Sequence, residues 1–279
     1  MSTYIHLEPE DIVCVALSGG KDSISLLYNL YLRFCKTQSP KLIALTVDEG
    51  ISNTFDHNQS AIKEFFKNYQ IDVPLIKASF KDIFGLSMDQ IVQKIQADDL
   101  KLNACTVCAS IRRRIINELA KEMGATKIAI GHNLDDVAQS LIMNVLRKDL
   151  HKIKENSPFE TAKKFSSRFL PRIKPLFMFT EDEIIQYCNV KELPYFSHTC
   201  QYSVDFPILR KKVQKFIKDL DDRSFEYKYN IIRFHLQINS EAGGTLIPKY
   251  TLCKICSYPT GSARDLCTFC EYKRYFTSE

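Results

Sequence analysis

The sequence predicts an α/β protein with a doubly wound parallel sheet, followed by a small cysteine-rich module. Short β-branched apolar runs alternate with amphipathic segments between residues 11 and 146, a pattern typical of a parallel sheet covered by helices on both faces. Residues 251–279 carry two cysteine pairs and are too few to bury an apolar core of their own. We therefore predict a main domain over 1–238, a linker over 239–250 and a metal-binding module over 251–279.

The elements of the main domain follow from local pattern. Buried strands are predicted over 11–17, 41–48, 73–78 and 127–131, because each is a short apolar run. Helices are predicted, from apolar residues at helical spacing, over 24–34, 55–69, 81–96, 107–123, 134–146, 181–192, 207–220 and 224–237. The polar stretch 149–170 is predicted to be a loop.

Composition sets broad limits on function. The 279 residues carry a formal net charge of +5, which permits nucleic-acid binding without requiring it. The basic residues gather in short clusters, such as 112–114 and 210–212, which either neutralise phosphates or are solvated helix faces. The sequence has no signal-peptide pattern and no apolar run approaching the ~20 residues that span a membrane. We expect a cytoplasmic protein without membrane contact.

A glycine loop joins the first strand to the first helix: Ser18-Gly19-Gly20-Lys21-Asp22-Ser23. The glycines permit close approach of a ligand to the backbone, the helix N-terminus attracts anions, and Lys21 adds a full positive charge. The loop differs from the phosphate loop of kinases and GTPases. It indicates a phosphate site; the plainer interpretation is a tight turn with a helix cap.

A second polar loop, Gly131-His132-Asn133-Leu134-Asp135-Asp136, follows the fourth strand. Because ligands bind at the carboxyl ends of parallel strands, both loops are placed to share one site. Asn133 and Asp136 also fit a helix cap with an acidic first turn. A carboxylate here could instead hold Mg²⁺ or transfer a proton.

Ten cysteines in a cytoplasmic chain favour metal or catalytic roles over disulfides. Cys253, Cys256, Cys267 and Cys270 have the spacing of a four-thiolate zinc site, and the metal would stabilise the short module. Cys105 and Cys108 alone are ambiguous between half a zinc site, a redox pair and cluster ligands. Cys200 stands far away in the sequence. We expect Cys14, Cys35 and Cys188 to be buried core thiols.

Several motifs together carry a family resemblance. SGGKDS at 18–23 resembles the loop of the PP-loop ATP pyrophosphatase superfamily, which has a Rossmann-like fold. With CxxCxxxRR from Cys105, GHNLDDVAQ from Gly131, RIKPL from Arg172 and CQYS from Cys200, the chain resembles the two-thiouridine tRNA synthetase family over residues 11–279. This family includes archaeal and eukaryotic cytoplasmic tRNA thiolation proteins and a bacterial enzyme acting on the T-loop uridine.

The resemblance implies site residues and cofactors. Cys105, Cys108 and Cys200 would ligate a [4Fe–4S] cluster with one iron that has no protein ligand. In an older interpretation, one of two of these cysteines carries a persulfide and the other is the resolving thiol. Arg112 and Asp136 would be catalytic. ATP and Mg²⁺ would bind at residues that comprise Ala16, Leu17, Ser18, Gly19, Gly20, Lys21, Asp22, Ser23, Val47, Gly131 and Asp136.

The resemblance also implies a reaction. ATP would adenylate the uridine O2, and sulfur would then replace AMP at C2 of a tRNA uridine. The expected partners are tRNA, a thiocarboxylated ubiquitin-like carrier or free sulfide, and a second copy of the chain. Alternatives are another adenylating enzyme, of the lysidine synthetase or amide ligase type, and a non-catalytic zinc-ribbon RNA-binding protein.

Two features depart from the family pattern. We expect the family's N-terminal zinc ribbon to be absent, since only ten residues without cysteine precede Asp11, and Gln201 replaces the commoner proline after Cys200.

Overall fold

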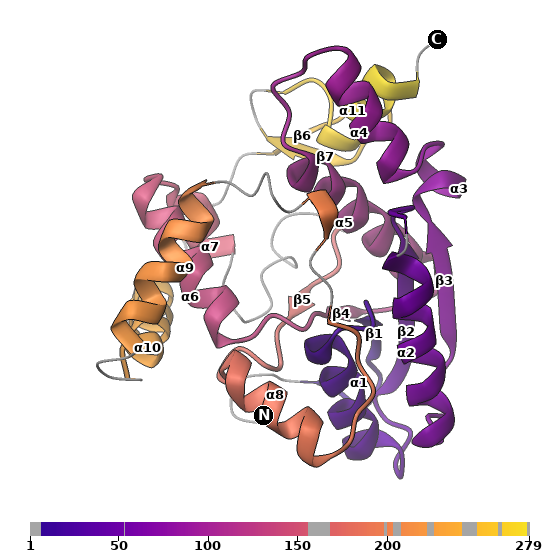
Figure 1. Ribbon diagram of the computed structural model, residues 1–279, viewed down its shortest axis with the longest axis vertical. Coiled ribbons are helices and arrows are strands. Elements are labelled where there is room, and N and C mark those ends of the chain that lie inside the picture. The colour runs from indigo at the N-terminus through magenta and orange to yellow at the C-terminus, as the bar shows by residue number, and fades with distance from the viewer. Residues whose placement is uncertain are drawn as a thin grey trace.

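The centre of the molecule is a five-stranded parallel sheet, as predicted (Figure 1). The computed structural model describes residues 7–52, 54–155, 168–197, 200–202, 208–221, 226–241, 250–261 and 264–277. The strands lie in the order β3 (Leu75–Ser79), β2 (Lys41–Asp48), β1 (Ile12–Ala16), β4 (Lys127–Ala129) and β5 (Arg172–Ile173). Four of them were predicted; the two-residue β5 was not.

The strand order reverses between β1 and β4. From β1 the chain continues outward to β2 and β3, and it later returns to the other side of β1 with β4 and β5. Such a reversal opens a crevice at the carboxyl ends of the two central strands, where ligands bind in this class of sheet. The loops 18–23 and 131–136 both leave the sheet at this point.

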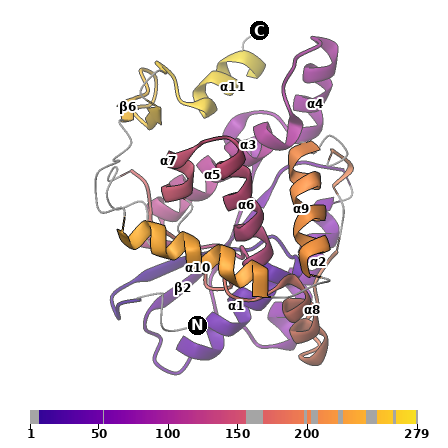
Figure 2. The same cartoon turned by 90° about the vertical axis from the view of Figure 1, so that its left-hand side faces the viewer.

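Helices complete the domain, and their bounds are α1 (Lys21–Phe34), α2 (Thr54–Asn68), α3 (Phe80–Phe84), α4 (Met88–Ala97), α5 (Ala104–Glu122), α6 (Leu134–Leu146), α7 (Leu150–Glu155), α8 (Glu181–Val190), α9 (Ile208–Asp221) and α10 (Glu226–Glu241). Helices α1, α2 and α8 pack on one face of the sheet, and α5 packs on the other. Helices α6, α9 and α10 form a separate bundle (Figures 1 and 2).

Three predictions from the helical pattern were wrong in detail. The predicted helix over 81–96 is two helices, because Gly85 ends α3 with φ 102° and Ser87 starts α4 with a capping box. Helix α5 begins at Ala104, three residues earlier than predicted, so Cys105 lies with Cys108 in its first turns. The predicted loop 149–170 contains α7 over 150–155; residues 156–167 lie outside the described residues.

The C-terminal module packs firmly on the main domain. It consists of β6 (Tyr250–Leu252), antiparallel to β7 (Pro259–Gly261), and α11 (Thr268–Thr277). Phe276 of α11 is fully buried in an apolar cluster with residues of α3, α4 and α5. Lys94 Nζ donates to the Phe276 carbonyl at 2.8 Å. Helix α10 continues through Glu241, into the predicted linker; residues 242–249 lie outside the described residues.

We expect Phe276→Ala to lower the free energy of unfolding by about 3–5 kcal/mol, because the ring is removed from a closed apolar cluster. Chemical denaturation measures the change. Phe234→Ala is the matched control, since that ring is 60% exposed and its removal should change stability by less than about 0.5 kcal/mol. Equal effects of the two substitutions would show that α11 does not share the core.

Among the helices of the described residues, none has both the length and the apolar character needed to cross a bilayer.

Candidate active site

The glycine loop holds its shape by internal hydrogen bonds. Gly19 has φ 84°, and a Cβ there would lie 2.8 Å from the Asn58 carbonyl oxygen, so the position requires glycine. The Ser23 hydroxyl accepts from the Ser18 N–H at 3.1 Å and lies 3.0 Å from the Gly20 carbonyl, to which it donates. Gly20 is the N-cap of α1, and no side chain of the described residues caps this helix. Its N-terminal N–H groups are therefore available to an anion.

The second loop touches the first at Gly131. A Cβ at Gly131 would lie 3.0 Å from the Asp22 carbonyl carbon, so glycine is needed for this approach. Asn133 donates from Nδ2 to Asp22 Oδ1 at 3.1 Å, and its Oδ1 accepts from the Asp136 N–H at 3.0 Å. Asn133 therefore caps α6, as predicted, and also fastens the two loops together.

Lys21 stands at the junction of the two loops with a carboxylate on each side. Its Nζ lies 3.1 Å from Asp22 Oδ2 and 2.8 Å from Glu181 Oε1. Burial alone would lower the pKa of Lys21, but the pairs with Glu181 and Asp22 raise it overall, so the side chain stays charged. Glu181 was not predicted from the sequence, because it stands in the first turn of α8, where acidic residues ordinarily stabilise the helix N-terminus.

The two aspartates of α6 have different surroundings. Asp135 accepts the Glu181 N–H at 2.8 Å and pairs with Lys228, so it ties α6 to α8 and α10. Asp136 pairs with Arg210 Nη2 at 3.2 Å. Burial raises the pKa of Asp136, although Arg210 opposes this. A carboxyl with a raised pKa is suited to accept a proton.

Positive charge surrounds His132. The pKa of His132 is lowered to about 3, first by desolvation and then by the charges of Lys174 and Arg210. Part of the residue is nevertheless exposed to solvent. The imidazole is therefore neutral at physiological pH. Lys174 is only 7% exposed, and burial followed by Arg172 lowers its pKa to about 8. Such a cluster of cations favours an anionic ligand.

The buried Lys174 charge should make stability depend on pH. Between the folded pKa of about 8 and the ordinary 10.5 the unfolded chain binds more protons, so stability rises with pH across this window. At pH 7 the buried charge of Lys174 lowers the free energy of unfolding by its full amount, about 3 kcal/mol. Lys174→Met should therefore be more stable than wild type at pH 7, and the difference should shrink toward pH 10. Urea unfolding measures it. Lys36→Met, at an exposed position, is the control, and a pH-independent difference would contradict the prediction.

The segment 200–202, which carries Cys200, lies beside the start of α5. Cys105 Sγ lies 3.6 Å from the Tyr202 carbonyl oxygen. Burial raises the pKa of the Cys108 thiol to about 12; Arg112 opposes the shift, whereas Glu49, Cys200 and Cys105 add to it. Cys200 is therefore close enough to Cys108 to influence its ionisation. Three soft thiol ligands of this kind suit an iron–sulfur cluster, and binding would displace their protons.

The segment that carries Cys200 is fixed to the glycine loop. The Phe196 N–H donates to the Gly19 carbonyl at 3.0 Å, and the Phe196 ring stacks on His57 of α2 with centroids 4.8 Å apart. Cys200 follows four residues later, and four extended residues cover at most about 14 Å. Cys200 therefore lies no more than about 14 Å from Phe196, the residue that contacts the glycine loop.

Arg112 lies on α5 beside the cysteines. Its Nη1 is 3.0 Å from Glu49 Oε1, and the guanidinium remains about half exposed. The sequence analysis did not identify Glu49, which follows β2 at the carboxyl edge of the sheet.

The remaining sequence-predicted residues are placed as follows. Ala16 ends β1, and Val47 lies on β2, partly buried. The Leu17 side chain is in the core, so only its backbone can face a ligand. Cys14 and Cys188 are buried as predicted, but Cys35 is half-buried, because it follows the last residue of α1.

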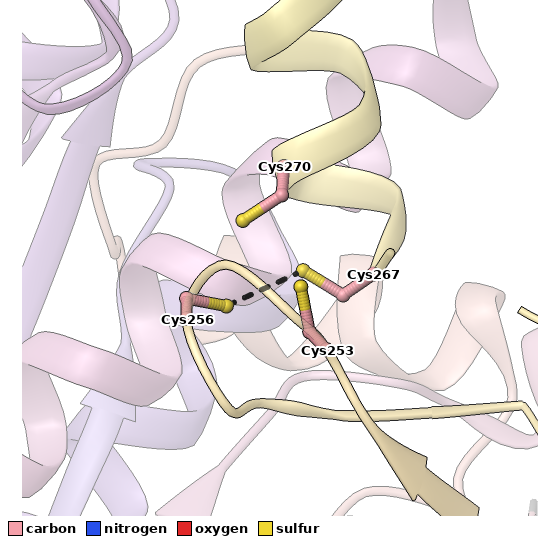
Figure 3. Close-up of side chains that lie close together, drawn as sticks. All are labelled: Cys253, Cys256, Cys267 and Cys270. Carbon is pink, nitrogen blue, oxygen red and sulfur yellow. Dashed lines mark hydrogen bonds between the residues drawn. The ribbon is translucent and has the colours of Figure 1, made fainter. Parts of the chain in front are cut away.

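Figure 3 shows the four C-terminal cysteines converging on one point. Their sulfurs all lie within 4.8 Å of one another, and Cys256 Sγ is 3.6 Å from Cys267 Sγ. Tetrahedral zinc with ~2.3 Å bonds to sulfur needs sulfurs about 3.7 Å apart, so the group fits a metal ion. Arg114 of α5 stacks 3.5 Å above the Tyr258 ring and donates to Cys256 Sγ at 3.7 Å. These contacts join the four C-terminal cysteines to α5, the helix that carries Cys108.

A parallel α/β sheet with a glycine loop at its switch point is typical of nucleotide-binding proteins. Comparison with known protein families identifies the family to which this chain belongs. The chain belongs to the PP-loop domain family, whose model matches residues 2–220. The fold and the family predicted from the sequence are confirmed.

Within that family the chain is similar to proteins of tRNA thiolation. A protein of Methanocaldococcus jannaschii named "Probable sulfurtransferase" is 30% identical over 260 residues, which are 92% of this chain and 72% of the relative. Cytoplasmic tRNA 2-thiolation protein 1 of Drosophila melanogaster is 32% identical over 266 residues, or 91% and 75% of the two chains. The structure of the U34-tRNA thiolase NcsA from Methanococcus maripaludis, with its [4Fe-4S] cluster, matches with TM-score 0.78 and 31% identity, over 96% of this chain and 82% of that one.

Proposed function

We propose that the protein is an ATP-dependent tRNA uridine 2-sulfurtransferase. One observation carries the proposal: the Phe196 N–H donates to the Gly19 carbonyl, so the chain that leads to Cys200, four residues later, starts at the glycine loop. The similarity to tRNA thiolation proteins and to a thiolase with a [4Fe-4S] cluster supports it. A nucleotide site beside three thiols suits a reaction that couples ATP cleavage to sulfur transfer.

The first step is adenylation of the base. ATP with Mg²⁺ binds at residues 18–23, where Lys21 and the N-terminus of α1 neutralise the phosphates. The uridine O2 attacks the α-phosphorus, so an O–P bond forms while the bond to pyrophosphate breaks. Asp136, whose pKa is raised by burial, accepts the proton that leaves N3 of the uridine.

The second step replaces AMP with sulfur. Cys105, Cys108 and Cys200 would hold a [4Fe–4S] cluster, which when bound supplies an iron without a protein ligand that can carry sulfur. The bond from C2 to the AMP oxygen breaks as the C2–sulfur bond forms. Arg112, next to Cys108, stabilises the negative charge on the departing AMP.

The proposal includes partners and a second metal site. The uridine must be unstacked to reach the site, so it would come from a loop of the tRNA. Sulfur would come from a thiocarboxylated ubiquitin-like carrier or from free sulfide. Zinc would occupy Cys253, Cys256, Cys267 and Cys270. We also propose a homodimer in the cytoplasm, on the resemblance to the family.

Helix α9 supports tRNA binding. It begins at the site, where Arg210 pairs with Asp136, and continues outward with exposed lysines at 212, 215 and 218. Lysines in such a row can contact successive phosphates of an RNA backbone.

Replacing Lys212, Lys215 and Lys218 with glutamine should weaken tRNA binding and reduce its salt dependence. Each lost phosphate contact lowers the slope of log K against log salt by roughly 0.7–0.9, so a change of about 2 is expected. Fluorescence anisotropy with labelled tRNA measures the slope. Glutamine at the exposed Lys36, Lys63 and Lys67 is the charge-matched control. An identical loss of tRNA affinity in both triple variants would mean that net charge, and not the position of these lysines on α9, determines binding.

The function is tested by assaying tRNA nucleosides directly. Anaerobically purified protein is incubated with unmodified tRNA, ATP, Mg²⁺ and sulfide, and the digested tRNA is analysed by mass spectrometry. We expect 2-thiouridine, dependent on ATP, with AMP formed in equal amount. In a parallel incubation with lysine and ammonium in place of sulfide, ATP-dependent formation of lysidine or an amide would indicate another adenylating enzyme. tRNA binding without ATP cleavage would indicate a non-catalytic RNA-binding protein.

A further inference from the structure

A single carboxylate joins the two chain segments that flank the cysteine group. Asp89, in the first turn of α4, accepts the Tyr202 hydroxyl on Oδ1 at 2.7 Å. Its Oδ2 accepts the Ser52 N–H at 3.0 Å and the Ser52 hydroxyl at 2.5 Å. Three hydrogen bonds from two segments therefore converge on one side chain.

Each of these segments holds a neighbour of Cys108. The segment 49–52 carries Glu49, the partner of Arg112, and is further fixed to α4 by the Met88 N–H, which donates to the Glu49 carbonyl at 2.7 Å. The segment 200–202 carries Cys200, and the Tyr202 carbonyl lies 3.6 Å from Cys105 Sγ. Asp89 thus connects both sides of the cysteine group without lying next to any of the three cysteines in the sequence.

The chemistry of the contact requires a carboxylate. All three groups that contact Asp89 are donors, and an ionised carboxylate is an acceptor on both oxygens. An asparagine at position 89 would present an NH₂ group to either Ser52 or Tyr202 and lose that contact.

We propose that Asp89 is a positioning residue that holds Cys200 at the distance from Cys105 and Cys108 at which the three thiolates retain an iron–sulfur cluster. This inference rests on the proposed function for the identity of the bound group. The placement of Cys200 itself does not, because it can be measured without the group.

The first measurement is cluster retention. Asp89→Asn and Tyr202→Phe should lose iron to an excess of chelator about tenfold faster than wild type, a loss typical of residues that orient metal ligands. Ser52→Ala, which removes bonds only on the other side of the carboxylate, should lose iron at close to the wild-type rate. Asp219→Asn, on α9, is the remote control. Zinc at Cys253–Cys270 should stay at wild-type content in all variants, which separates positioning from unfolding.

The second measurement needs no cluster. A short bismaleimide is added to full-length protein that lacks iron but retains zinc at Cys253–Cys270, and cross-links from Cys200 to Cys105 or Cys108 are counted by peptide mass spectrometry. We expect Asp89→Asn and Tyr202→Phe to reduce these cross-links several-fold. Wild-type cross-linking and wild-type iron retention in both variants would overturn the proposal. Wild-type protein that binds no cluster would instead overturn the proposed function, and the cross-links would still decide the role of Asp89.

Discussion

Replacing Cys200 with alanine is expected to abolish formation of 2-thiouridine while ATP still binds. Cys200 is the one thiol of the group contributed by the segment that follows α8, so its loss leaves only the α5 pair. Replacing a residue that only orients a metal ligand already lowers metal affinity or activity about 10–100-fold. Replacing the ligand itself should therefore lower the rate of thiolation more than about 100-fold. The Kd of ATP should change by less than about twofold, because Lys21 and the N-terminus of α1 are untouched.

Single-turnover thiolation and equilibrium binding of ATP measure the two effects separately. Cys35→Ala is the matched control, since this half-buried thiol follows α1 and lies outside the proposed site. A Cys200→Ala protein that thiolates tRNA at the wild-type rate would rule out a role for this sulfur. A protein that also fails to bind ATP would indicate a folding defect and require the milder Cys200→Ser variant.

Removing the zinc proposed for the Cys253–Cys270 group should release the whole C-terminal module. Structural zinc sites contribute roughly 10–16 kcal/mol of apparent binding free energy, more than a short segment gains from burying Phe276. The contacts of Arg114 with Tyr258 and Cys256 would be lost with it, and they lie on the helix that carries Cys108. We therefore expect thiolation to fall together with the metal content.

Hydrogen exchange after chelation measures this release. Amides of 250–261 and 264–277 should exchange much faster, whereas those of β1 and β2 should remain protected. Cys267→Ser should reproduce the result without a chelator, and Cys35→Ser should not. Protection of the module in metal-depleted protein would mean that apolar packing alone holds it.

Local sequence pattern was sufficient to predict most of the strands and helices. The predicted strand 41–48 coincides with β2, because a continuous apolar run is the signature of a buried parallel strand. The two-residue β5 has no such run, and its position depends on pairing with β4. The break between α3 and α4 was missed because apolar spacing continues across it, although Gly85 and the Ser87–Gln90 capping box were visible in the sequence.

The site was only partly predictable, for a different reason. The loops 18–23 and 131–136 carry compact motifs, so their residues could be named. Glu49, Asp89 and Glu181 act through partners 37 to 160 positions away. Acidic residues at the start of a helix ordinarily serve as caps, so neither Asp89 nor Glu181 has a local feature that sets it apart. Only the fold brings them to the cysteines and to Lys21.

The central claim is that thiolates from α5 and from the Cys200 segment hold one iron–sulfur cluster beside the nucleotide loop. Anomalous diffraction at the iron absorption edge, from an anaerobically grown crystal, tests it most directly. We predict an iron peak among Cys105, Cys108 and Cys200, on the side of the sheet where residues 18–23 lie. Iron found only at Cys253–Cys270, or no iron near Cys200, would contradict the claim.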